Sequence, residues 1–72
     1  MAVLSPTQHR AEQALRQSPI PALRRLVVEE TEAQVVISGR VTSYYLKQLA
    51  QETVLPVLEN RPLNNQVTVV RI

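Results

Sequence analysis

The spacing of the apolar residues changes twice in the second half of the chain, and this change constrains the fold more than any other feature. In residues 34–41 apolar residues alternate with others, as in a strand with one buried face, and alternation returns in "QVTVVRI" at residues 66–72. Between these segments apolar residues recur every three or four positions, as on one face of a helix, at Leu46, Leu49, Ala50, Val54, Val57 and Leu58. The second half is therefore predicted to form a strand, a helix and a strand, joined by a right-handed crossover.

Pro56 interrupts the helical spacing. A proline inside a helix removes one backbone N–H donor and clashes with the preceding turn. We expect the helix either to kink near Glu52 or to end early, with "VLEN" as an irregular last turn and "RPLNN" as a loop. Thr42 or Ser43 is the predicted N-cap of this helix.

The first half has its own start and stop signals. Ser5 is the predicted N-cap of a first helix, followed by Pro6 at the first helical position, and "SPIP" ends that helix. Residues 23–29 are predicted to be a strand with Leu26 and Val28 on one face. The segment "EETEA" lacks the Asn-Gly or Asp-Gly pair of a tight turn, so we expect a longer, more mobile hairpin loop.

The order α-β-β-α-β predicts an α+β fold in which two helices pack on one face of a three-stranded sheet. The third strand lies either beside the second or beside the first, and the sequence leaves both arrangements open. Seventy-two residues make a single domain, residues 1–72, of modest stability, with residues 1–4 expected to fray. Because the chain has no cysteine, neither disulfides nor thiolate metal sites contribute.

Gly39 is the only glycine, and it lies within "VVISGRVTS". Its place in the alternating strand predicts that it faces inward, where it lets a helix backbone approach the sheet or permits a bulge. A phosphate-binding loop is the competing interpretation, but no GK[ST] or GxGxxG motif follows. We therefore predict structural roles for Gly39, as for Ser5 and Pro56.

The inventory of reactive side chains argues against an enzyme. The chain has no Asp, no Cys, one His and six Glu. His9 has no acidic partner by spacing and is interpreted as a solvated helix residue. The glutamates at 29, 30 and 32 lack the dense oxygen ligands of a calcium loop and are interpreted as a solvated hairpin. No catalytic residue, cofactor or metal is predicted.

The charge and the apolar runs bear on partners and location. The net charge is +2, and the basic residues are scattered along the sequence, which is weak support for a nucleic-acid partner. The apolar runs fall far short of the ~20 residues of a membrane-spanning helix. The start, "MAVLSPTQHR", has no pattern of a secretion signal.

Two groups of residues are candidates for an interaction surface. Tyr44 and Tyr45 are neighbours on the helix, point about 100° apart and cannot both face inward, so at least one is expected on the surface near Arg40 and Lys47. There it would meet lipid headgroups, stack on a ligand or cover the sheet edge, or else sit part in the core and part at its rim. Alternation also places apolar residues on the uncovered face of the sheet, although β-branched residues suit strands whatever they face. The predicted interaction surface comprises Val27, Val36, Arg40, Tyr44 and Val70, with Ile72 on the same face.

The run from "LRRLVVEETEAQVVISGRVTSYYLKQLAQETV" to "LNNQVTV" resembles the BON domain, a bacterial module of osmotically induced and nodulation proteins. The resemblance covers about residues 10–70. It rests on the family's alternating apolar positions, its glycine, its small polar cap and its closing "apolar, Asn, apolar, apolar" pattern, matched by Val35, Ile37, Gly39, Val41, Ser43, Ala50, Val54, Leu63, Asn65, Val67 and Val69. The chain departs from the family at Glu32 and Ala33, where Asp-Gly is common, at Asn60, where Gly is common, and at Pro56.

The resemblance implies a noncatalytic module of envelope stress proteins, secretins and channel-associated proteins that contacts anionic phospholipid surfaces or protein partners. A homodimer is among the partnerships we expect. The family is usually periplasmic or envelope-associated, but without a secretion signal in this chain a cytoplasmic location also stays open. The alternative is RNA binding, because α-β-β-α-β resembles the K-homology arrangement, but that fold needs a GxxG loop that a chain with one glycine lacks.

Overall fold

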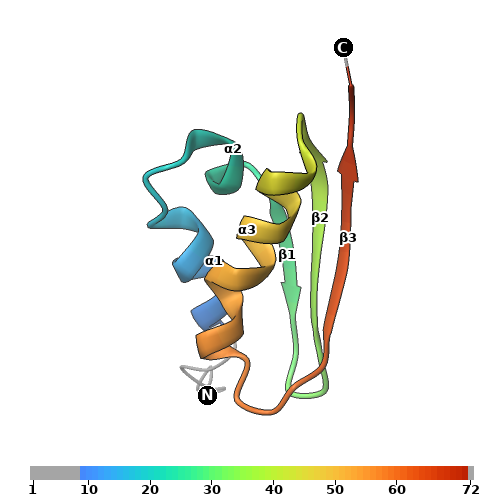
Figure 1. Ribbon diagram of the computed structural model, residues 1–72. Helices are drawn as coiled ribbons and strands as arrows, with labels where there is room; N and C mark the ends of the chain where they lie inside the picture. Colours follow the sequence, from blue (N-terminus) through green and yellow to red (C-terminus); the bar gives the residue numbers. More distant parts are fainter. Residues whose placement is uncertain (1–8, 72) are drawn as a thin grey trace.

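The computed structural model describes residues 9–71. It contains helices on one side of a mixed sheet, an α+β architecture as the sequence predicts (Figure 1). The elements along the chain are α1 (Arg10–Arg16), α2 (Pro21–Arg24), β1 (Val27–Glu30), β2 (Val35–Val41), α3 (Tyr44–Val54), the 3₁₀ helix η2 (Leu55–Val57) and β3 (Leu63–Val69).

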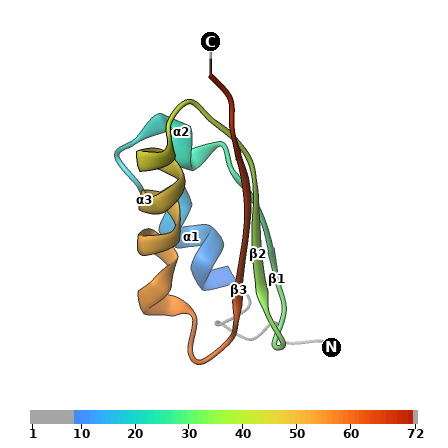
Figure 2. The same cartoon turned by 45° about the vertical axis from the view of Figure 1, so that its right-hand side comes forward.

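The sheet has the order β1-β2-β3, which settles the arrangement that the sequence left open. β1 pairs antiparallel with β2, and β2 pairs parallel with β3 over their full seven residues. Within the described residues, the helices lie on one side of the sheet and leave its other face bare (Figure 2). The chain is therefore a two-layer structure with one uncovered sheet face.

The core lies between the helices and the inner face of the sheet. It is built from the residues that the apolar spacing singles out, because alternate strand positions and every third or fourth helix position point the same way. The buried apolar residues are Ala11, Leu15, Leu23, Leu26, Val35, Ile37, Val41, Ala50, Val54, Leu58 and Val67.

Gly39 adopts a backbone conformation that other residues rarely reach, with φ +130°. A Cβ atom placed there would lie 2.8 Å from Cδ2 of Leu26, a core residue just before β1. The close neighbour is thus the start of β1 and not a helix, and the β2–β3 register passes through Gly39 without a bulge. Gly39 is required by backbone conformation and by packing between two strands.

The first strand begins later along the chain than the sequence predicts. Pro21 begins the four-residue helix α2, so the strand predicted from residue 23 starts only at Val27. Proline suits the first turn of a helix because its missing N–H has no partner there in any case. The prediction of an N-cap at Ser5 lies outside the described residues.

The crossover helix follows the prediction closely at both ends. The Ser43 hydroxyl accepts a hydrogen bond from the backbone N–H of Leu46 at 3.2 Å, which caps α3. The helix ends at Val54, and Pro56 lies in the 3₁₀ turn that follows, so the early end is confirmed. Asn60 has φ 69°, a conformation that Asn tolerates better than most residues.

The last strand begins earlier than predicted. Leu63 to Asn65, expected as loop, form the first part of β3 because the sheet pairing starts with Val35 N donating to Pro62 O at 3.0 Å. After the strand, Val70 N still donates to Val41 O at 2.8 Å. The polar residues Asn64 and Asn65 are typical of a loop, but here they belong to a strand because they pair with β2.

The hairpin between β1 and β2 is held by Thr31. Its backbone N–H donates to Gln34 O at 2.9 Å, and its hydroxyl accepts from the N–H groups of Ala33 and Gln34, both at 3.1 Å. The reversal therefore uses a threonine side chain in place of the glycine of a tight turn.

Candidate functional site

The topology gathers four chain segments at one end of the molecule. Because β2 and β3 are parallel, their carboxyl ends lie together, and α3 starts directly after β2 at the same end. β1 is antiparallel to β2, so its start, preceded by α2, lies there too, whereas the hairpin lies at the opposite end (Figure 1).

Both tyrosines of α3 are on the surface at this end. Tyr44 is 65% exposed and Tyr45 is 69% exposed, so the expectation that at least one of them lies on the surface is met by both. The inward positions of α3 are taken by Ala50 and Val54, with Leu46 and Leu49 partly buried beside them. The packing of this helix on the sheet therefore uses no aromatic side chain, and both tyrosine rings are accessible on the surface.

Exposed arginines lie at the same end of the molecule as the tyrosines. The Arg71 guanidinium lies over the Tyr44 ring, with Cζ 5.9 Å from the ring centroid. Arg40 is the exposed residue before the end of β2, and Arg25 precedes Leu26, which packs against Gly39 and so brings Arg25 to the level of Arg40. We call Arg25, Arg40, Tyr44, Tyr45 and Arg71 the tyrosine–arginine end.

The glutamates lie elsewhere. Three of the six are at or beside the hairpin, Glu59 follows η2 at the same end, Glu12 is in α1 and Glu52 is in the third turn of α3. Among residues 9–71, the ion pairs use Arg10, Arg16 and Arg61, and none uses an arginine of the tyrosine–arginine end. The basic residues outside these ion pairs lie in or beside the elements that meet at the tyrosine–arginine end: Arg24, Arg25, Arg40, Lys47 and Arg71.

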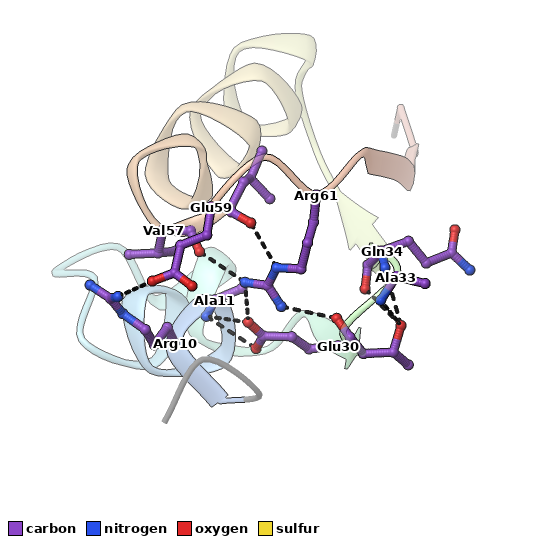
Figure 3. A network of polar contacts seen from close by, with 10 residues as sticks. Arg10, Ala11, Glu30, Ala33, Gln34, Val57, Glu59 and Arg61 are labelled. Atoms are coloured by element: carbon purple, nitrogen blue, oxygen red, sulfur yellow. Dashed lines mark hydrogen bonds and ion pairs between the residues drawn. The ribbon is translucent and has the colours of Figure 1, made fainter. Parts of the chain in front are cut away.

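The hairpin end holds a buried ion pair that the sequence reasoning missed. Arg61 Nη2 lies 2.8 Å from Glu30 Oε2, with side chains only 7% and 3% exposed (Figure 3). The guanidinium also donates to the carbonyl oxygens of Thr31, Val57 and Leu58 at 3.1, 2.9 and 2.7 Å. The prediction that Glu30 belongs to a solvated hairpin is therefore wrong. Glu30 lies two positions after Val28 and shares its inner face of the strand, and this alternation was the signal for its burial.

The same network fixes the start of α1. The backbone N–H of Ala11 donates to both carboxylate oxygens of Glu30, at 3.1 and 3.2 Å, and Arg10 pairs with Glu59 at the surface. A carboxylate at a helix start satisfies N–H groups that have no partner in the helix. The role of this end is to join α1, the hairpin and η2, so its charges are structural.

The predicted interaction surface is divided by the structure. Arg40, Tyr44 and Val70 lie at or beside the tyrosine–arginine end, and Val70 is 38% exposed. Val27, 54% exposed, and Val36 are diagonal neighbours farther along the bare sheet face, because Val27 pairs with Ser38 and Glu29 with Val36. Exposed polar residues of β3 separate these two valines from Val70.

The sequence predicted only part of the tyrosine–arginine end. Arg71 and Tyr45 were not included in the predicted surface, and Arg25 was placed on a strand. The signal that would have found Arg71 is the parallel pairing of β3 with β2, because it brings residues after β3 to the start of α3. That pairing was one of two strand orders that the sequence allowed.

The described residues form neither a pocket nor a cluster of three or more potential metal ligands. His9 precedes α1 and is exposed, without a side-chain hydrogen bond to the helix start. In residues 9–71, no helix has the length and apolar character needed to cross a bilayer. The surface of these residues is marked instead by a charged and aromatic end.

Comparison of the chain with protein-family models, with curated proteins and with solved structures gives no match. The resemblance to the BON domain thus stays a prediction that rests on the residues quoted for it.

Proposed function

We propose that this protein is a noncatalytic binding module that makes peripheral contact with anionic phospholipid surfaces through its tyrosine–arginine end. One observation supports this proposal above the others: two exposed tyrosines share an end with three exposed arginines and with no glutamate. Tyrosine and arginine are also the side chains that combine an apolar body with a group suited to headgroups.

The expected energy makes the contact weak. Each basic residue near an anionic surface contributes about 1 kcal/mol, so the three arginines contribute about 3 kcal/mol. The attraction falls off within a Debye length, about 8 Å at physiological ionic strength. Binding should therefore weaken steeply as salt rises.

The distribution of charge also sets an orientation. The hairpin end carries exposed glutamates, among them Glu29 and Glu32, which an anionic surface repels. The tyrosine–arginine end therefore turns toward the lipid and the hairpin turns away. The apolar face of α3 is packed on the sheet, so the contact involves headgroups and α3 does not enter the acyl layer.

The test is a titration of the full chain with vesicles of phosphatidylserine and phosphatidylcholine, with pure phosphatidylcholine vesicles and with single-stranded RNA, at low and moderate salt. The double variant Arg40→Gln/Arg71→Gln should lose about 2 kcal/mol of vesicle affinity, about thirtyfold, because two of the three charges are gone. Its matched control is Arg10→Gln, which removes a charge at the hairpin end and should leave binding nearly unchanged.

Selective binding to the anionic vesicles supports the proposal. Equal binding to both vesicle types would refute it. So would a loss of vesicle affinity in Arg10→Gln as large as that in each of the single variants Arg40→Gln and Arg71→Gln. Tight RNA binding with a steep salt slope would instead favour a nucleic-acid partner.

A further inference from the structure

The bare face of the sheet is a second surface, which shares Arg40 with the tyrosine–arginine end. The helices cover the opposite face, and within residues 9–71 no element packs on this one (Figure 2). A partner could meet the sheet on this face or along either edge strand.

The edge of β3 is closed at its centre by Asn65. Its side-chain oxygen accepts from the backbone N–H of Val67 at 3.1 Å, and its nitrogen donates to Lys47 O at 3.2 Å. The pairing of Pro62 and Val70 with β2 shows that the odd-numbered residues of β3 direct their backbone groups to the free edge. Asn65 thus occupies an N–H that an added strand would need.

The edge of β1 is short and partly occupied. The strand has four residues, and the carbonyl of Leu26 just before it accepts from the Arg16 guanidinium at 3.0 Å. Two copies pairing here would bring Glu29 and Glu30 of one copy beside those of the other, and like charges opposite each other are destabilising. The bare face is the surface that remains.

The register arranges this face in rows that run across the strands. One row contains Glu29, Val36 and Asn64, the middle row contains Val27, Ser38 and Gln66, and the third contains Arg40 and Thr68. The face is therefore negative toward the hairpin, neutral in the middle and positive toward the other end.

We infer that two copies of this chain pack bare face to bare face with their strands antiparallel. This arrangement stacks β1 on β1 and brings the row of Glu29 over the row of Arg40 in the other copy, where Glu29 lies one strand from Arg40 and at the position of Arg25. It does so twice, because the twofold axis repeats every contact. The middle row of one copy faces the middle row of the other, so Val27 lies against Val27. The small side chain of Ser38 allows the two sheets to approach closely. A parallel arrangement would instead set Arg40 against Arg40, which the like charges disfavour.

The size of the face predicts a weak dimer. Seven residues at about 3.3 Å and three strands about 4.8 Å apart span roughly 23 by 14 Å, so each copy buries about 300 Å², less than half of the roughly 800 Å² per partner in a stable protein interface. The dimer should therefore form in a concentration-dependent way. It should also weaken with salt, because its specific contacts are exposed ion pairs.

Sedimentation equilibrium of the full chain, without vesicles, tests this inference over a wide range of concentration. The wild type should show a reversible monomer–dimer equilibrium. Glu29→Arg should raise the dimer dissociation constant by about tenfold, because two ion pairs become two repulsions, and Arg40→Glu should do the same. The double variant Glu29→Arg/Arg40→Glu exchanges the charges and should restore association.

Two further variants keep the result decisive. Glu32→Arg makes the same charge change in the hairpin, off the face, and should leave the equilibrium nearly unchanged, whereas Val27→Lys should also weaken the dimer. Circular dichroism of each variant checks that the monomer is folded. A wild type that is monomeric throughout, a charge exchange that does not restore association, or equal effects of Glu29→Arg and Glu32→Arg would each overturn the inference.

Discussion

The two ends of the molecule use the same charged residue types in opposite ways. At the hairpin end, Arg61 and Glu30 are buried together, and the guanidinium donates to three carbonyl oxygens while the carboxylate accepts from α1. At the tyrosine–arginine end, the arginines are exposed and outside the ion pairs of the described residues. Charge that is paired and buried holds the fold together, whereas charge left in solvent is available for a partner.

The largest expected effect comes from breaking the buried pair. Arg61→Met leaves the Glu30 carboxylate without its charged partner and removes the guanidinium donor from three carbonyl groups, of which Leu58 O still accepts from the backbone N–H of residue 61, so it should cost about 3–5 kcal/mol of unfolding free energy. For a domain of this size, that loss approaches the whole stability. Urea denaturation followed by circular dichroism measures it.

The double variant Glu30→Leu/Arg61→Met is the matched control. It should be less destabilised than the sum of the two single variants, because no lone charge stays buried. A loss below about 1 kcal/mol for Arg61→Met would contradict the structural role of this end.

Gly39 and Arg40 are neighbours in β2 with different roles, since Gly39 is packed against Leu26 and Arg40 is exposed. Gly39→Val should cost about 1–3 kcal/mol, because it adds bulk against Leu26 and forces a β-branched residue to φ +130°. Arg40→Gln should change stability by less than about 0.5 kcal/mol. Thermal unfolding measures both variants, and an unchanged melting temperature for Gly39→Val would refute the packing argument.

The smallest effect separates aromatic contact from charge at the tyrosine–arginine end. Tyr44→Ser/Tyr45→Ser should leave the melting temperature nearly unchanged, because both rings are exposed, while lowering vesicle affinity several-fold. Leu55→Ser removes a similarly exposed apolar residue at the far end of α3 and should not affect vesicle binding. Equal losses for the two variants would show that the tyrosines have no specific part in the contact.

The sequence predicted the parts of this molecule that depend on spacing within one segment. The α+β class, the inward residues of β2 and the end of α3 before Pro56 follow from periodicity and from proline geometry. It could not choose the strand order, because that depends on which strands meet after the chain has folded. The tyrosine–arginine end depends on this order, so only Arg40, Tyr44 and Val70 near it were identified.

The sequence also did not predict which charged residues are buried. Glu30 follows Glu29 and precedes Glu32, so composition alone favours a solvated turn, and Arg61 is 31 positions from Glu30 in the sequence. Their pairing is a tertiary contact without a local signal. β3 was shortened for a similar reason, because Asn64 and Asn65 suggest a loop until β2 is present to pair with them.

The separation in sequence of the partners around Arg61 has a consequence for the kinetics of folding. The guanidinium reaches Thr31, 30 positions away, and the Glu30 carboxylate reaches Ala11, 19 positions away, so the network needs the hairpin, η2 and α1 already in place. Contacts that form late contribute little to the folding rate and mostly slow unfolding. The buried pair should therefore mainly slow unfolding. Breaking it should raise the unfolding rate constant much more than it lowers the folding rate constant.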